Sequence, residues 1–203
     1  MQCGIGRTGK LFGYQSFCNA GCTPDKCVTN PKACISPDII TMAKPLAAGL
    51  PLGAVVVAAH VATCIKAGEH GTTYGGGPLT TRVGQYVWNT VSNPVFLDHV
   101  KEMGQLIQKK GEELVKMSPL VKQIRGKGLL KGMELRETVP TNVFVDLCRE
   151  NGVLVVSAGS NTIRLIPALI VSESQINDAF KVFETVITQM EGLLASGKLD
   201  VKK

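Results

Sequence analysis

The spacing of apolar residues alternates between helical and strand-like periods along the chain. Apolar positions recur every three or four residues over about 79–92 and 96–117, which predicts two amphipathic helices. Residues 141–152 show the same period and end at a glycine, so a shorter helix is expected there. Runs rich in β-branched residues predict strands within 121–136, 153–158 and 161–170. Strands that alternate with helices are typical of an α/β protein.

The last helix is marked by its start as well as by its period. Ser172 and Gln175 form a capping-box sequence, in which each side chain bonds the backbone amide of the other residue. The apolar residues behind it repeat at helical spacing and predict one buried stripe, made of Ile176, Phe180, Phe183, Ile187 and Met190. The charged tail from about Ser196 is expected to fray.

The first 95 residues have a different character. A glycine-rich opening leads into a polar loop over residues 15–37, and a short apolar run then ends at Lys44. The unbroken β-branched run at 53–60 predicts a strand that is covered on both faces. Because the pattern changes near residue 95, we expect two domains. Residues 1–95 would be part of a large domain, and residues 96–203 a small α+β domain with a connecting helix.

Composition favours a packed domain and argues against two kinds of partner. Hydrophobic residues make up 44% and charged residues 19% of the 203 positions, which is enough to form a core. The formal charge of +6 suits anionic substrates, whereas scattered basic residues and 5% aromatics argue against a nucleic-acid surface. No apolar run reaches the ~18 residues of a membrane span, and the N-terminus has no signal-peptide pattern. We expect neither a nucleic-acid nor a membrane partner.

Gly4, Gly6 and Gly9 match the G-x-G-x-x-G spacing of a dinucleotide-binding loop. That loop follows a strand and opens a helix, so that backbone amides reach the pyrophosphate. No strand pattern precedes the three glycines, and a broken loop follows them. A glycine-rich turn is therefore the better interpretation.

Lys44 is set apart by its neighbours. Apart from Thr41, the residues on both sides of it are apolar, with IITMA before and PLAAGLPLGAVVV after. A lysine at the end of a buried strand loses solvation, which favours the neutral amine and frees it to attack an aldehyde. An ordinary surface lysine is the alternative that these residues leave open.

Four segments occur in the order and approximate spacing of class III (ornithine-type) aminotransferases: GIGRTGKLFGY, PDIITMAKPLAAGLPLGAVVV, EHGTTYGGGPL and NTIRLIPALIV. Apart from residues 15–36, the chain resembles this family over nearly its whole length, most closely the acetylornithine type of plants and related eukaryotes. The resemblance implies an α/β fold, namely the C-terminal part of the large domain of a fold type I (aspartate-aminotransferase-like) transferase and its small α+β domain. It also implies pyridoxal phosphate as cofactor and a homodimer in the intact enzyme.

The resemblance implies a role for each residue that matches a family motif. Lys44 matches the lysine that links covalently to pyridoxal phosphate and later moves the proton. Gln2 would lie against the cofactor ring, and Thr73 would reach the cofactor phosphate of the neighbouring subunit. Thr72 would lie beside the substrate. Arg164 matches the arginine that binds the substrate carboxylate, for which its fork-shaped guanidinium is suited.

The implied reaction is transfer of the terminal amine of N-acetylornithine to 2-oxoglutarate, giving glutamate, as a step of arginine biosynthesis. Within the family, ornithine, 4-aminobutyrate or another ω-amine is the alternative substrate. Outside catalysis, the chain could be a truncated isoform that associates with full-length subunits. The resemblance implies residence in the mitochondrial matrix or the plastid stroma.

The sequence departs from the family pattern in two places. It starts at Met1, where the family has the valine of D-E-V-Q, so the aspartate that stabilises the cofactor ring is missing and this chain alone is expected to transaminate poorly. Residues 15–36 form a cysteine-rich insertion. Its cysteines are Cys18, Cys22, Cys27 and Cys34, separated by three, four and six residues. These spacings lack the regular pairs of structural zinc sites, so we expect no metal there. A zinc site or one disulfide is the alternative.

Overall fold

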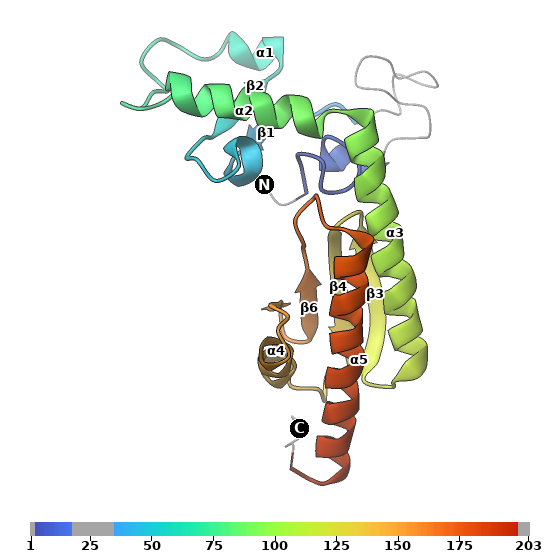
Figure 1. Cartoon of the computed structure of the whole chain (residues 1–203). Helices are drawn as coiled ribbons and strands as arrows, with labels where there is room; N and C mark the ends of the chain where they lie inside the picture. Colours follow the sequence, from blue (N-terminus) through green and yellow to red (C-terminus); the bar gives the residue numbers. More distant parts are fainter. Residues whose placement is uncertain (1–2, 18–34, 199–203) are drawn as a thin grey trace. The chain divides into compact units, whose positions relative to one another are not determined.

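The computed structural model describes residues 3–17 and 35–198, and the chain divides into two compact units. Unit 1 comprises Met1–Asp98 and unit 2 comprises His99–Lys203. Both units combine helices with strands, and within the described residues each has its own sheet (Figure 1). In the same part of the chain, no helix is both long enough and apolar enough to cross a bilayer.

Unit 1 is built around a two-stranded antiparallel sheet, in which Ile39 lies opposite Val57 and Met42 opposite Ala54. A small apolar cluster of Ile5, Leu46 and Val91 links the opening turn to the helices. The elements of this unit are the 3-10 helices η1 (Gly13–Phe17) and η3 (Lys44–Ala47), the strands β1 (Ile39–Met42) and β2 (Ala54–Val57), and the helices α1 (Ala59–Ala62) and α2 (Pro78–Val91).

The predicted glycine-rich turn is confirmed. Gly6 and Gly9 have positive φ angles of 82° and 76°, which glycine adopts without steric cost. The Gly6 amide donates to the Leu11 carbonyl at 3.1 Å and the Gly9 amide donates to the Gly6 carbonyl at 2.9 Å. These bonds close a turn rather than opening a helix, so the turn does not form a dinucleotide-binding loop.

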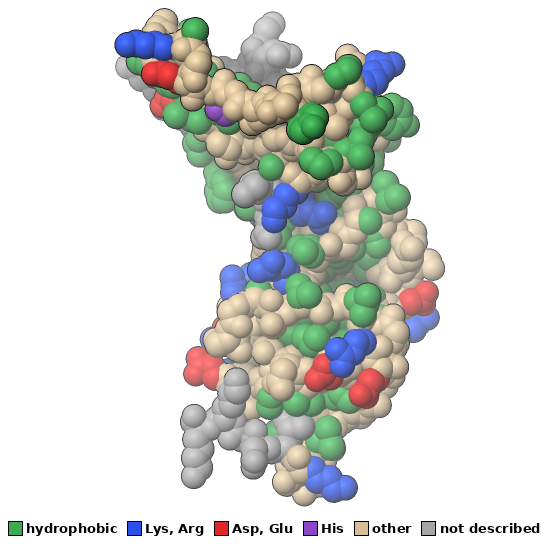
Figure 2. All heavy atoms as spheres, turned by 90° about the vertical axis from the view of Figure 1, so that its left-hand side faces the viewer, with side chains coloured by type: hydrophobic (Ala, Val, Ile, Leu, Met, Phe, Trp, Pro, Cys, Tyr) green, Lys and Arg blue, Asp and Glu red, His purple; other side chains and the backbone are tan. Residues whose placement is uncertain are grey.

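The prediction that the run at 53–60 is covered on both faces is wrong. Val55 is 53% and Val56 50% exposed, although the strand itself forms as β2. In the described part of unit 1, β2 pairs only with β1, and a two-stranded sheet cannot cover both faces of either strand. Figure 2 shows hydrophobic side chains at the surface of this unit, which include Ile39, Val55, Val56, Ile65, Tyr74, Leu79 and Tyr86.

Unit 2 contains a four-stranded antiparallel sheet in the order β3-β4-β6-β5. The helices and strands expected from the apolar spacing are all present, but β5 and β6 are shorter than the predicted 153–158 and 161–170, because residues 153–155 and 166–170 lie outside the ladders. The elements are α3 (Pro94–Met117), β3 (Val121–Lys127), β4 (Leu130–Leu135), α4 (Thr141–Glu150), β5 (Val156–Ala158), β6 (Thr162–Leu165) and α5 (Glu173–Ala195).

One face of this sheet is buried by α3, which packs against its first two strands. Ile124, Met133 and Ile163 lie opposite one another across three strands and are at most 8% exposed. Gly111 of α3 lies so close that a Cβ on it would come within 2.8 Å of Ile124 Cγ1. Because side chains alternate between the two faces along a strand, the residues next to Ile124, Met133 and Ile163 lie on the opposite face of the sheet, which is open.

The predicted capping box and buried stripe of α5 are both confirmed. The Gln175 amide donates to Ser172 Oγ at 3.2 Å, and the Ser172 amide donates to Gln175 Oε1 at 2.9 Å. Phe183 packs against Phe180, with ring centroids 5.2 Å apart, and against Phe144 of α4 at 6.1 Å. All five residues of the stripe are at most 3% exposed: Ile176, Phe180, Phe183, Ile187 and Met190.

Candidate functional site

Lys44 occupies a strained backbone position where β1 gives way to η3. The preceding residue Ala43 is extended, with φ −161° and ψ −165°, whereas Lys44 has φ 56° in the left-handed region. That conformation costs an L-residue roughly 1–2 kcal/mol, so non-glycine residues adopt it mainly where the surroundings impose it. Pro45 follows in the first turn of η3, where its fixed φ suits a helix start. Such strain is found preferentially at functional sites.

The side chain of Lys44 is exposed in this chain, so the expectation of a desolvated lysine at the end of a buried strand is wrong. The apolar neighbours Leu46 and Ala47 are buried at 7% and 0%, while Lys44 remains in contact with solvent. The lysine that burial does desolvate is Lys131 of β4, which is 7% exposed and has a lowered pKa for that reason. Its Nζ donates to Gln108 Oε1 at 2.7 Å, a structural link to α3.

Thr72 and Thr73 lie in the turn that precedes α2, and both are exposed. The Gly75 amide donates to the Thr72 carbonyl at 3.3 Å, and a Cβ at Gly75 would come within 2.7 Å of Thr72 Oγ1. A side chain at Gly75 would therefore force the Thr72 hydroxyl to move. Thr81 Oγ1 donates to the Gly77 carbonyl at 2.9 Å and ties the turn to the first residues of the helix.

Arg164 lies on β6 of unit 2, opposite Gly132 on one side and Val156 on the other. Its side chain is partly exposed, and the residue borders a cavity of about 300 Å³ whose other lining residues are uncharged. The apolar part of that lining includes Leu154 and Phe180. With the described residues Arg164 forms neither a hydrogen bond nor an ion pair, so its guanidinium is available to an anion.

The residues singled out from the sequence therefore belong to separate parts of the chain. Lys44, Thr72 and Thr73 lie in unit 1, whereas Arg164 lies in unit 2. No hydrogen bond among the described residues joins Lys44 to either threonine. Gln2 lies outside the residues that the structure describes.

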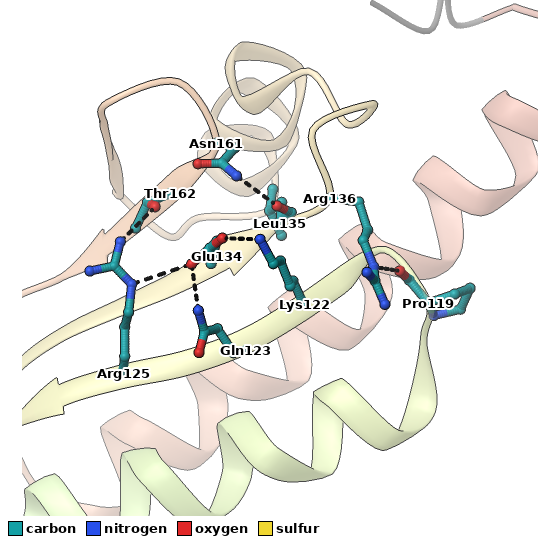
Figure 3. A network of polar contacts seen from close by, with 9 residues as sticks. All are labelled: Pro119, Lys122, Gln123, Arg125, Glu134, Leu135, Arg136, Asn161 and Thr162. Atoms are coloured by element: carbon teal, nitrogen blue, oxygen red, sulfur yellow. Dashed lines mark hydrogen bonds and ion pairs between the residues drawn. The ribbon is translucent and has the colours of Figure 1, made fainter.

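Sequence reasoning missed a polar network on the open face of the unit 2 sheet (Figure 3). Glu134 of β4 is its centre: Oε1 lies 2.8 Å from Lys122 Nζ, and Oε2 accepts a 2.7 Å hydrogen bond from Gln123 Nε2. Arg125 Nε lies 3.4 Å from Glu134 Oε2, and Arg125 Nη2 donates to Thr162 Oγ1 at 3.4 Å. These partners leave the carboxylate side chain only 12% exposed.

The network holds Glu134 in its charged form. The hydrogen bond from Lys122, then that from Gln123, and more weakly the nearby positive charges lower the pKa of Glu134 from 4.5 to about 2. Because the folded-state pKa lies below the unfolded value, the group stabilises the fold fully above pH 4.5 and progressively less as the pH falls toward about 2.

Replacing Glu134 by glutamine is expected to remove part of the acid sensitivity of the chain. Unfolding of the wild type should take up about one proton more than that of Glu134→Gln between pH 4.5 and about 2. Urea unfolding midpoints across this range measure the difference. Asp146→Asn is the control, since its 2.8 Å pair with Arg149 is half exposed. Parallel pH profiles for the wild type and Glu134→Gln would contradict the assignment.

The cysteines of the described residues provide neither a metal site nor a disulfide. No group of three or more His, Cys, Asp or Glu side chains in this part of the chain is arranged to hold a metal ion. Cys148 is buried, which raises the pKa of its thiol to about 12, whereas Cys3 and Cys64 are exposed. Three dispersed cysteines are usually buried as apolar thiols, and that expectation from the sequence holds for Cys148 alone. The four cysteines of the cysteine-rich segment lie outside the residues that the structure describes: Cys18, Cys22, Cys27 and Cys34.

Comparison with known proteins defines the class. The profile of the family "Aminotransferase class-III" matches residues 1–187, so the chain belongs to the class-III aminotransferases. The solved acetylornithine aminotransferase of Elizabethkingia anophelis superposes with a TM-score of 0.77 and 30% identity, over 93% of this chain and 46% of that one. The ornithine aminotransferase of Toxoplasma gondii gives 0.78 and 28%, over 93% and 42%. The predicted α/β class III fold is confirmed.

Several curated relatives are named as acetylornithine aminotransferases. The mitochondrial acetylornithine aminotransferase of Yarrowia lipolytica is 40% identical over 188 residues, which are 92% of this chain and 41% of that protein. A probable mitochondrial acetylornithine aminotransferase of Dictyostelium discoideum is 38% identical over 192 residues, or 94% and 39%. The chain therefore spans about two fifths of the length of these relatives.

Proposed function

We propose that this chain provides the cofactor lysine and the carboxylate-binding arginine of an acetylornithine aminotransferase. The observation that carries the proposal is Lys44: a non-glycine residue in the left-handed region at the end of β1, with an exposed amine. A surface lysine with no function would not need such a backbone. The names of the curated relatives support N-acetylornithine as amine donor, and the family resemblance implies 2-oxoglutarate as acceptor.

The residues present fit pyridoxal phosphate in part. Lys44 would hold the aldehyde carbon, and Thr73, which is exposed on its turn, would donate its hydroxyl to the phosphate of the neighbouring subunit's cofactor. Thr72 would lie beside the substrate, and Gln2 against the ring. When bound, the cofactor supplies an electron sink for the substrate carbon that loses its proton. The amine of Lys44 would take that proton and return it.

Arg164 would orient the substrate by its carboxylate. Its guanidinium presents paired donors in a plane, which suits a bidentate carboxylate, and no described residue competes for it. Both proposed substrates carry carboxylates. The net charge of +6 would also favour the approach of such anions.

The wider assignments follow from the family. Residues 1–95 would be part of the cofactor-binding large domain, and residues 96–203 its small domain with a connecting helix. The intact enzyme would be a homodimer. The mitochondrial names of the relatives favour the mitochondrial matrix over the plastid stroma for this protein.

Chemical trapping tests the role of Lys44 without requiring turnover. Incubation of the chain with pyridoxal phosphate, reduction with borohydride and peptide mass spectrometry are expected to place the label on Lys44, because reduction makes the carbon–nitrogen link permanent. Lys44→Arg should lose the label, while Lys66→Arg, a change at another exposed lysine of unit 1, should keep it. Equal labelling of all exposed lysines would refute the proposal. Amine transfer from N-acetylornithine compared with ornithine then identifies the donor.

Association with longer class-III subunits is the second candidate function. It is favoured by the large apolar side chains that unit 1 exposes, among them Tyr74 at 91% and Leu79 at 71%. A chain that acts this way would capture pyridoxal phosphate at Lys44 only after mixing with a full-length acetylornithine aminotransferase. Labelling of Lys44 in the chain alone would favour the first proposal, in which the chain itself binds the cofactor.

A further inference from the structure

The open face of the unit 2 sheet carries two arginines in one cross-strand row. The register places Arg125 of β3 opposite Gly132 of β4, and Gly132 opposite Arg164 of β6. Residues directly opposite one another project from the same face, and the two outer α-carbons lie about 10 Å apart, twice the strand spacing. Gly132 contributes no side chain between them. The row could therefore present two guanidinium groups to one ligand.

The two arginines nevertheless differ in their partners. Arg125 is engaged by Glu134, with Nε 3.4 Å from Oε2, and it donates to the buried Thr162 hydroxyl. Arg164 has no hydrogen-bond or ion-pair partner among the described residues, although it is only two positions from Thr162 in the same strand.

We propose that Glu134 and Arg125 restrict this sheet face to a single carboxylate, bound at Arg164. Glu134 pairs with Arg125 and, with Thr162, holds its guanidinium over the sheet and away from the ligand. Glu134 and Arg125 are positioning and specificity residues, since they act by leaving Arg164 as the one free guanidinium of the row. The inference deepens the proposed function and rests on the role of Arg164 given there.

The charge of Glu134 explains why this residue would determine how many carboxylates the sheet face binds. Without its carboxylate, two free guanidiniums about 10 Å apart would attract a dicarboxylate more strongly than a monocarboxylate. With it, the carboxylate is shared between Lys122 at 2.8 Å and Arg125 at 3.4 Å, so Arg125 is directed toward Glu134 and Thr162 rather than toward the second carboxylate of a ligand.

Residue-by-residue modification with phenylglyoxal, which attacks free guanidinium groups, tests this inference on the intact 203-residue chain. In the wild type, Arg164 should react faster than Arg125, and glutarate and butyrate should protect Arg164 to a similar extent. In Glu134→Gln, Arg125 should react about three-fold faster, as expected for loss of a partly exposed ion pair. Glutarate should then protect both arginines better than butyrate does. Asp146→Asn removes a carboxylate from α4 instead and should change neither arginine.

The outcomes separate this inference from the proposed function. If no carboxylate protects Arg164 in the wild type, the proposed role of Arg164 fails, and the inference with it. If Arg164 is protected but Arg125 reacts equally fast in the wild type, only the inference is overturned. That comparison needs no variant. Should Glu134→Gln not fold, Thr162→Val removes the other partner of Arg125 at nearly constant shape and should also accelerate its modification.

Discussion

Gly104→Ala is expected to lower the free energy of unfolding by about 3 kcal/mol, at the upper end of the range for overpacked sites. Gly104 lies in α3 where the helix crosses the β3–β4 turn. A Cβ at this position would come within 2.6 Å of the carbonyl carbon and oxygen of Gly128 and within 2.7 Å of its Cα. These are backbone atoms, and Gly128 is itself held at φ 52°, so neither side can yield without moving the hairpin.

A second helical glycine provides the matched control. Gly192 of α5 has no atom within 4 Å of the position that a Cβ would occupy. Gly192→Ala should therefore stabilise the chain by roughly 0.5–1 kcal/mol, because alanine has the higher helix propensity. Urea unfolding of the two variants beside the wild type measures both changes. A gain in stability for Gly104→Ala would show that α3 does not pack against the turn as described.

Phe144→Ala is expected to cost about 3–5 kcal/mol, the usual range for a buried phenylalanine. Phe144 is fully buried and its ring packs against Phe183, so it joins α4 to α5. Its loss leaves a cavity where these two helices meet. Leu154→Ala is the control: this side chain is 84% exposed, and its removal should change stability by less than about 0.5 kcal/mol.

The measurement for Phe144→Ala is the thermal midpoint followed by circular dichroism, compared with Leu154→Ala under the same conditions. Helix α4 also contacts β5 and β6, the strand that carries Arg164. Loss of Phe144 should therefore loosen the sheet as well as the helix pair. If the two variants had the same thermal midpoint, the packing of α4 on α5 would contribute little to the stability of the fold.

Much of unit 2 could be predicted because its periods and end signals are local. The capping box at Ser172 and the helical spacing behind it identified α5 and its buried stripe before any contact was known. The length of β5 could not be predicted in the same way. Residues 153–155 have strand-forming side chains, but a strand also needs a partner, and the pairing with β6 begins only at Val156.

The Glu134 network could have been found by counting across the hairpin. Lys127 faces Leu130 at the turn, so two steps back on each strand place Arg125 opposite Gly132, and two more place Gln123 opposite Glu134. What counting cannot supply is burial. Glu134 lies on the open face of the sheet, and only the side chains folded over it leave it 12% exposed.

For this protein, the sequence by itself determined the family, the order of the helices and strands, and the identity of Lys44 and Arg164 as candidate residues, because motifs and periods are properties of neighbouring positions. Tertiary structure alone decided which side chains are desolvated. It left Lys44 exposed on a strained backbone, buried Lys131 beneath α3, and left β2 half uncovered. Solvent exposure depends on what packs over a residue, and that is set by segments distant in the chain.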